Sequence, residues 1–192
     1  MTKKRRRLFK PTVVFLSAVF LIFVIFFASL NLARQLYPTK YSDFVESYTL
    51  EYNLQKSFVY AVIKCESGFD ERAVSSVGAK GLMQIMPETF LWLQGKTGEE
   101  LSEEMLFDAE TNIKYGSLLY SGLIKNFGDV KTAVAAYHAG WGNVKKWLSD
   151  KRYSKDGKTL YDIPFPSTKH YVERVMKTQK IYEKLYNINQ DD

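Results

Sequence analysis

Residues 13–30 form an unbroken apolar run, VVFLSAVFLIFVIFFASL, in which only Ser17 and Ser29 are polar. At a helical rise of about 1.5 Å per residue, this run is about 27 Å long, close to the hydrocarbon thickness of a bilayer. A soluble core of this size has no place for a helix that is apolar on every side. The run therefore predicts a single transmembrane helix over residues 12–33.

The charges around this run predict its orientation. Residues 1–34 contain seven basic side chains and no acidic one, and six of the seven precede the apolar run. Positive charge is retained on the cytoplasmic side of a membrane. We therefore expect a single-pass protein at the cell membrane, with residues 1–11 as a cytoplasmic basic tail, 34–41 as a linker and 42–192 as an extracytoplasmic domain that faces the cell wall.

A cleavable signal peptide is the alternative interpretation of the same segment. The apolar regions of signal peptides usually run about 7–15 residues and end in a small-x-small cleavage site. This run is longer, and the candidate site near Asn31-Leu32-Ala33 fits that rule poorly. The pattern favours an uncleaved anchor, and the domain is exported under either interpretation.

Composition excludes several classes of function for the exported part. Residues 35–192 carry 20 basic and 21 acidic side chains, so this part lacks the basic excess on which nucleic-acid binding depends. The chain has one cysteine, Cys65, and two histidines, His138 and His170, without a His-Glu-x-x-His pattern. We therefore expect no nucleic-acid partner, no metal and no cofactor.

The exported part has helical periodicity along most of its length, and its class is all-α. Asp108 and Asp129 are candidate caps at helix starts, and Gly128 is a candidate stop between them. Segments 69–86 and 149–166 are expected to be loops, and no convincing strand pair is present. The predicted helices cover residues 42–53 with Ser42 as the cap, 54–67, 87–94, 108–128, 129–137, 141–148 and a last segment that begins at Ser167 or Thr168.

Glu66 is the first candidate for chemistry, because it ends an apolar helix. Val62 and Ile63 lie four and three residues before it, directly beneath it on the helix surface. A carboxyl group on apolar neighbours loses hydration and its pKa rises, which suits a general acid near neutral pH. A solvated glutamate at a helix end is the alternative that this pattern leaves open.

Two further segments carry unusual patterns. Residues 78–87 read GAKGLMQIMP, where a glutamine, Gln84, stands inside a methionine-rich run and must find hydrogen-bond partners in the protein or a ligand. Residues 135–140 read AAYHAG, which places an aromatic and a polar side chain at a helix end before Gly140.

Together these segments resemble the lytic transglycosylases of the soluble-lytic family, relatives of goose-type lysozyme. The resemblance covers about residues 50–185. The family's motifs occur here in order as Glu66-Ser67, Ser75 through Pro87, Asn112 with Gly116, Ala136 through Gly140, and Tyr171-Val172.

The resemblance implies a lysozyme-like helical domain whose partner is the glycan strand of peptidoglycan. Glu66 would be the sole acid and base that cuts the β-1,4 bond between N-acetylmuramic acid (MurNAc) and N-acetylglucosamine (GlcNAc) and leaves a 1,6-anhydro end. The resemblance further implies substrate-binding roles for other residues, in which Tyr171 would hydrogen-bond Glu66 and Tyr137 would form part of the groove wall. Ser75, Gln84 and Met86 would line the glycan site.

Two departures from the family pattern keep alternatives open. His138 stands where the family has asparagine, and Pro166-Ser167-Thr168 stands where it often has Glu-Thr. The alternatives are a hydrolytic muramidase on the same fold, or a catalytically weak, membrane-tethered glycan-binding protein. The sequence names no protein partner.

Two kinds of side chain near these motifs are expected to be structural. Cys65 lies on the apolar face of its helix, which indicates an inert buried thiol rather than a nucleophile. The three tryptophans could stack on sugar faces, but they are expected in the core, because large aromatic side chains are more often buried than not.

Overall fold

The computed structural model describes residues 11–188, and the chain divides near Pro38 into two units that are treated separately. In the first unit, α1 spans Pro11–Leu36. It is long and apolar enough to cross a membrane, with a mean hydropathy of 3.0 and no buried residues in its most apolar stretch. Its two serine hydroxyls donate to carbonyls of the same helix, at 2.8 Å each. These two hydroxyls therefore need no partner outside the helix, as a lipid environment requires.

The second unit is all-α, and residues 11–188 contain no strand. Two isolated β-bridges, Val74 with Lys80 and Lys80 with Ile85, shape the loop that follows α3. The elements are α2 (Ser42–Tyr52), α3 (Lys56–Glu66), α4 (Pro87–Thr97), a 3₁₀-helix η1 (Glu103–Phe107), α5 (Ala109–Phe127), α6 (Val130–Ala139), α7 (Trp141–Leu148) and α8 (Pro166–Tyr186).

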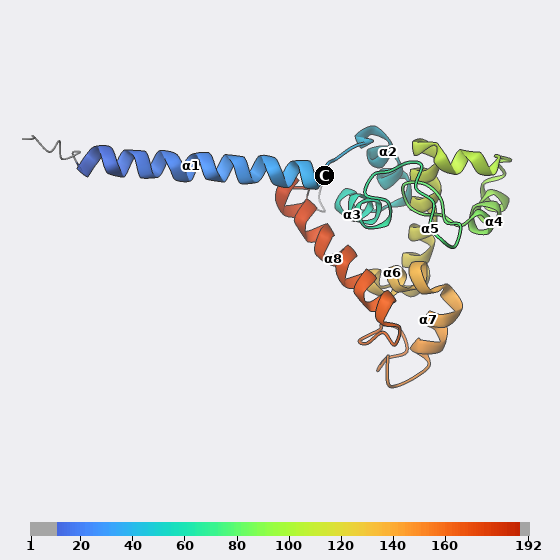
Figure 1. The fold of residues 1–192 in the computed structure, drawn as a ribbon. Coiled ribbons are helices and arrows are strands. Elements are labelled where there is room, and N and C mark those ends of the chain that lie inside the picture. Colours follow the sequence, from blue (N-terminus) through green and yellow to red (C-terminus); the bar gives the residue numbers. More distant parts are fainter. Residues whose placement is uncertain (1–10, 189–192) are drawn as a thin grey trace, which may run out of the picture. The chain divides into compact units, whose positions relative to one another are not determined.

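The core of this unit is built around α3, whose residues 57–63 are all buried. The long helix α8 packs along α3 and also contacts α6, while α5 packs against α2 and α6 (Figure 1). A helix that is surrounded in this way holds its last residue, Glu66, firmly against its neighbours. The fold thus fixes the position of the candidate acid.

Local signals set most helix ends as predicted. The carboxylates of Asp108 and Asp129 accept hydrogen bonds from the backbone N–H groups of Thr111 and Thr132, both at 2.8 Å. Gly128 ends α5 in the left-handed conformation. The prediction for Ser42 is wrong in detail. Tyr41, with φ of 61°, is the residue before α2, and Ser42 is its first helical residue.

The loop between α3 and α4 is anchored on α5 by Asn112. Its side-chain oxygen accepts from the Met83 N–H at 2.7 Å, and its amide donates to the carbonyls of Lys80 at 3.0 Å and Leu106 at 2.7 Å. Gly116, one turn further along α5, touches the same loop, because a β-carbon there would lie 2.4 Å from Met83 Sδ. Asn112 and Gly116 therefore lie one turn apart on α5 and together hold this loop against the helix.

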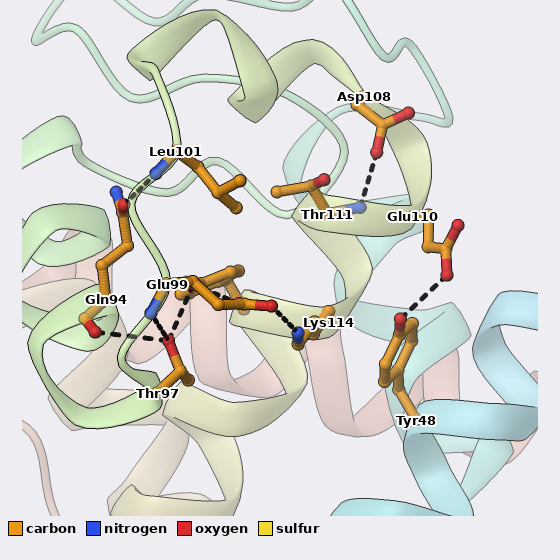
Figure 2. A network of polar contacts seen from close by, with 10 residues as sticks. Tyr48, Gln94, Thr97, Glu99, Leu101, Asp108, Glu110, Thr111 and Lys114 are labelled. Atoms are coloured by element: carbon orange, nitrogen blue, oxygen red, sulfur yellow. Dashed lines mark hydrogen bonds and ion pairs between the residues drawn. The ribbon is translucent and has the colours of Figure 1, made fainter.

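A polar network secures the segment that contains η1, which the sequence did not predict. The Glu99 carboxylate accepts from Lys114 and Tyr115 of α5, at 2.7 Å each, and Gln94 accepts from the Leu101 N–H at 2.6 Å (Figure 2). These bonds join the end of α4 to the first half of α5. They give the segment between α4 and α5 a rigid support.

Candidate active site

Glu66 lies at the end of α3 with most of its side chain removed from solvent. Burial raises the pKa of this carboxyl from its ordinary 4.5 to about 7, although the hydrogen bond from Tyr171 and the charge of Arg174 oppose the shift. The predicted effect of apolar neighbours on this pKa is confirmed. Near neutral pH the group exists in both protonation states, which an acid that later acts as a base requires.

A chain of three tyrosines supports this carboxyl. The Tyr171 hydroxyl donates to Glu66 Oε1, as predicted, and shares a 3.1 Å hydrogen bond with the hydroxyl of the fully buried Tyr120. The Tyr120 ring stacks on Tyr137 at 4.2 Å between ring centroids, and the Tyr137 hydroxyl donates to the Met83 carbonyl. The chain thus connects the carboxyl on α3, through α8, α5 and α6, to the loop before α4.

Burial raises the pKa of all three phenols well above the ordinary 10. These hydroxyls therefore stay protonated around neutral pH. They act as fixed hydrogen-bond donors and do not compete with Glu66 as acids.

Arg174 and His138 complete the surroundings of Glu66. The Arg174 guanidinium donates to the Cys65 carbonyl at 3.1 Å and lies 5.8 Å from the centre of the Tyr171 ring. The His138 ring stacks on Tyr171 at 4.7 Å, and its Nδ1 shares a 3.0 Å hydrogen bond with the hydroxyl of buried Thr168. Partial burial and the charge of Arg174 lower the pKa of His138, which favours the neutral ring.

No second carboxylate within residues 11–188 is among the groups that shift the pKa of Glu66. Asp70 is exposed and accepts from the Arg72 N–H at 2.9 Å, whereas Glu71 accepts from the Tyr41 hydroxyl at 3.2 Å. Both carboxylates next to Glu66 in the sequence therefore have other hydrogen-bond partners, Asp70 within the loop and Glu71 at Tyr41 before α2. This arrangement favours chemistry with one carboxyl over the paired-carboxylate mechanisms.

The other predicted site residues lie on the loop 69–86 or at its end. The Ser75 hydroxyl accepts from the Ala79 N–H at 2.9 Å and closes a turn. Gln84 has a φ of 52°, and its amide donates to the carbonyls of Ala73 and Gly81 at 3.1 and 2.9 Å. Met86 is half-buried at the start of α4. Gln84 thus shapes the loop through its N–H groups and keeps its side-chain oxygen available.

The structure separates the tryptophans that the sequence expected in the core. Trp147 is buried, but the side chains of Trp92 and Trp141 are exposed, so that expectation is wrong for two of the three. Cys65 is half-buried, lies 3.6 Å from the Thr178 hydroxyl, and has its thiol pKa raised by burial. A raised pKa lowers the thiolate fraction, which agrees with an inert thiol.

Sequence reasoning missed Tyr120 and Arg174 as parts of the site. Tyr120 lies inside the helix that was predicted over residues 108–128. A buried phenol needs a hydrogen-bond partner, so that position carried a signal. The position of Arg174 carried no such signal in the sequence, because only the packing of α8 on α3 brings this residue to Glu66.

Residues 43–160 match the transglycosylase SLT domain family. The chain is 32% identical over 154 residues to the soluble lytic murein transglycosylase of Escherichia coli strain K12, covering 76% of this chain and 23% of that protein. It is 28% identical over 169 residues to the membrane-bound lytic murein transglycosylase C of Serratia proteamaculans strain 568, covering 76% of this chain and 47% of that protein.

Solved structures agree with this family. The 70 kDa soluble lytic transglycosylase Slt70 of Escherichia coli superposes with a TM-score of 0.73 at 28% identity, over 82% of this chain and 26% of that one. An inactive variant of lytic transglycosylase Slt from Pseudomonas aeruginosa superposes with a TM-score of 0.70 at 31% identity, over 79% and 25%. The family match spans more than half of the chain, so the chain belongs to the transglycosylase SLT domain family. The chain itself spans about a quarter of the length of these soluble relatives.

Proposed function

We propose that this protein is a membrane-anchored lytic transglycosylase that cleaves the MurNAc–GlcNAc β-1,4 bond of peptidoglycan with Glu66 as sole acid and base. The observation that carries the proposal is the buried carboxyl of Glu66, whose pKa is about 7. The names of the soluble and membrane-bound relatives support the reaction and the substrate. The inactive Pseudomonas aeruginosa variant replaces one glutamate by glutamine, which fits a single essential carboxyl.

The proposed reaction uses one carboxyl twice, first as an acid and then as a base. Protonated Glu66 gives its proton to the glycosidic oxygen as the bond from C1 of MurNAc to that oxygen breaks, and GlcNAc leaves with a new hydroxyl. The 2-acetamido group of MurNAc stabilises the positive charge that develops at C1. The Glu66 carboxylate then takes the proton of the C6 hydroxyl as O6 bonds to C1. The 1,6-anhydro ring closes, Glu66 is protonated again and no water is consumed.

The surrounding residues have roles in this scheme that follow from their contacts. Tyr171 donates to Oε1 of Glu66, which fixes the carboxyl and leaves Oε2 for the substrate. Ser75, Gln84 and Met86 line the glycan site from the loop side, and Tyr137 forms part of the groove wall. The hydrogen bonds that Ser75, Gln84 and Tyr137 make within the protein keep these three side chains in place before substrate arrives.

For the anchor we propose the arrangement expected from the charges. Residues 1–11 lie in the cytoplasm, residues 12–33 cross the membrane, residues 34–41 form a linker, and residues 42–192 face the cell wall. Protease added to spheroplasts should degrade the domain and spare an epitope placed at the N-terminus. Protection of the domain would reverse the orientation.

Mass spectrometry of released muropeptides tests the proposed reaction. The full chain in detergent micelles should release products one water lighter than hydrolytic muropeptides, and Glu66→Gln should release none. Glu173→Gln is the matched control, because that carboxylate is exposed on α8 and its side chain is 63% accessible. Hydrated products would indicate a muramidase on the same fold. No product from the wild type would favour a glycan-binding protein.

A further inference from the structure

A groove of about 530 Å³ lies between α8, the start of α6 and the end of the loop that follows α7, and we call it the α8 groove. Tyr171, which holds Glu66, and Lys180, which lines the groove, are nine residues apart on α8. Nine residues make about two and a half helical turns, so these two side chains lie on opposite faces of the helix. The α8 groove is therefore separate from the candidate active site.

Unpaired positive charge lines the α8 groove. Three of its lysines are exposed and form no ion pair with any residue of 11–188, namely Lys131, Lys177 and Lys180. A fourth, Lys169, is paired with Asp162 at 2.8 Å, and the groove has one other acidic side chain. Residues 35–192 as a whole carry 20 basic and 21 acidic side chains. The surplus of positive charge is therefore local to this groove.

The floor and one wall of the α8 groove are apolar. The side chains of Ile163, Val172 and Met176 line it. The Tyr161 ring also lines it and is 56% exposed, while its hydroxyl donates to two carbonyls of the same loop at 3.1 and 2.6 Å. Apolar side chains among unpaired lysines suit an acidic protein segment that carries apolar side chains of its own. A polymer of bare phosphates would leave the apolar floor without a partner.

This chain contains such a segment between α4 and α5. Residues 97–113 carry six acidic side chains and no basic one. Four of the six have partners in the same domain, but Glu100 and Glu104 are exposed and form no ion pair with any described residue. Each is followed directly by a half-buried apolar side chain, Leu101 or Met105. The segment thus matches the α8 groove in charge and in apolar character.

The groove and the acidic segment lie at opposite ends of α5. The acidic segment leads into the first turn of α5, whereas Lys131 lies in the first turn of α6, just after α5 ends. The 19 residues of α5 span about 28 Å. In Figure 1 the segment after α4 lies at the top of the second unit and the loop after α7 at the bottom. The groove of one copy can therefore meet this acidic segment only in another copy.

We propose that the α8 groove of one copy binds the acidic segment 97–108 of a second copy. Two different surfaces meet in this head-to-tail contact, so it extends into rings or rows of copies. Exposed ion pairs hold two proteins only weakly in solution. Copies that are anchored in one membrane, as proposed above, meet at a high local concentration, which strengthens a weak contact. The contact does not depend on the reaction proposed at Glu66.

Zero-length cross-linking of ammonium groups to carboxylates tests this contact. An equal mixture of ¹⁴N- and ¹⁵N-labelled full chain in phosphatidylcholine vesicles is treated with a carbodiimide, and the linked peptides are identified by mass spectrometry. Links from Lys177 or Lys180 to Glu100 or Glu104 should join peptides of different isotope, which only two copies can supply. The yield of linked dimer should fall about tenfold in 1 M salt, where charges are screened beyond about 3 Å.

Charge reversal on each surface gives a stricter test. The double variant Lys177→Glu with Lys180→Glu should lower the yield of linked dimer about tenfold, and so should Glu100→Lys with Glu104→Lys. An equal mixture of the two double variants should restore the dimer, because each groove then faces a segment of opposite charge. Restoration also shows that both variants are folded.

The matched control is Lys125→Glu with Lys146→Glu. These lysines are exposed and lie outside the α8 groove, and the change in net charge is the same. This variant should form as much linked dimer as the wild type.

Each outcome decides the proposal. Links between isotopes that vanish in each double variant and return in their mixture support it. Links within single copies only, or a dimer that neither double variant changes, would overturn it. Protection of Lys177 and Lys180 from acetylation by phosphatidylglycerol vesicles, without links in phosphatidylcholine, would overturn it in favour of an anionic lipid surface.

Discussion

Glu66→Gln should stabilise the domain at the same time as it abolishes activity. Below about pH 4.5 the wild-type carboxyl is protonated in both the folded and the unfolded protein, so it contributes no pH-dependent term. As pH rises from 4.5 towards 7, the unfolded chain releases this proton while the folded protein retains it. Stability therefore falls over this window, and the whole cost is present above pH 7.

The size of this cost follows from the pKa of Glu66. A rise from 4.5 to about 7 corresponds to about 3 kcal/mol in the free energy of unfolding. Glutamine is close in shape to the protonated carboxyl, and its side-chain oxygen can still accept from Tyr171. The variant thus removes the charge and keeps the contact. It should match the wild type at pH 4 and exceed it by about 3 kcal/mol at pH 8.

Urea unfolding of residues 39–192 at pH 4, 5.5 and 8 measures this difference. This unit contains every buried core residue of the described chain. The control Glu173→Gln should show no pH-dependent difference, because that carboxylate is exposed. A Glu66→Gln protein that is no more stable than the wild type at pH 8, or whose gain is the same at all three pH values, would refute the reasoning.

Other variants test the parts that hold the site. Wild-type activity should fall as pH rises through about 7, the pKa of Glu66; a profile that is flat to pH 9 would contradict the acid role. Tyr171→Phe removes a hydrogen bond that lowers this pKa, so the fall should move to higher pH and kcat should drop about tenfold; an unmoved profile would contradict the contact. Asn112→Ala removes two hydrogen bonds to the loop before α4 and one to the Leu106 carbonyl of η1 and should cost about 3 kcal/mol in urea unfolding; a cost below 1 kcal/mol would show that the loop docks without it. Ser117→Ala removes a buried hydroxyl that has no hydrogen-bond partner among residues 11–188 and should raise the free energy of unfolding by about 1 kcal/mol; a loss of stability would mean that this hydroxyl has a partner.

Features that depend on neighbouring residues could be predicted from the sequence. The caps at Asp108 and Asp129 and the stop at Gly128 fixed the ends of two helices, because each acts through backbone groups within one turn. The raised pKa of Glu66 followed from the apolar residues one turn before it. Ser42 was the exception, because the chain enters α2 through a left-handed Tyr41 that no local rule indicates.

Features that depend on packing between distant helices could not be predicted. The hydrogen bond between Tyr120 and Tyr171 joins residues 51 positions apart, and Arg174 approaches Glu66 because α8 lies along α3. The exposure of Trp92 and Trp141 also depends on how distant helices pack. Their patterns suit a core, and the arrangement of α4 and α7 leaves them at the surface, where both line a groove.

Digestion of peptidoglycan in water enriched in ¹⁸O, followed by mass spectrometry of the new ends, tests the central claim most directly. The full chain in detergent micelles should produce 1,6-anhydro ends that carry no ¹⁸O, because the C6 hydroxyl attacks C1 in place of water. Glu66→Gln should produce no new ends, and Glu173→Gln should match the wild type. New ends that carry ¹⁸O, or unchanged cleavage by Glu66→Gln, would contradict the account.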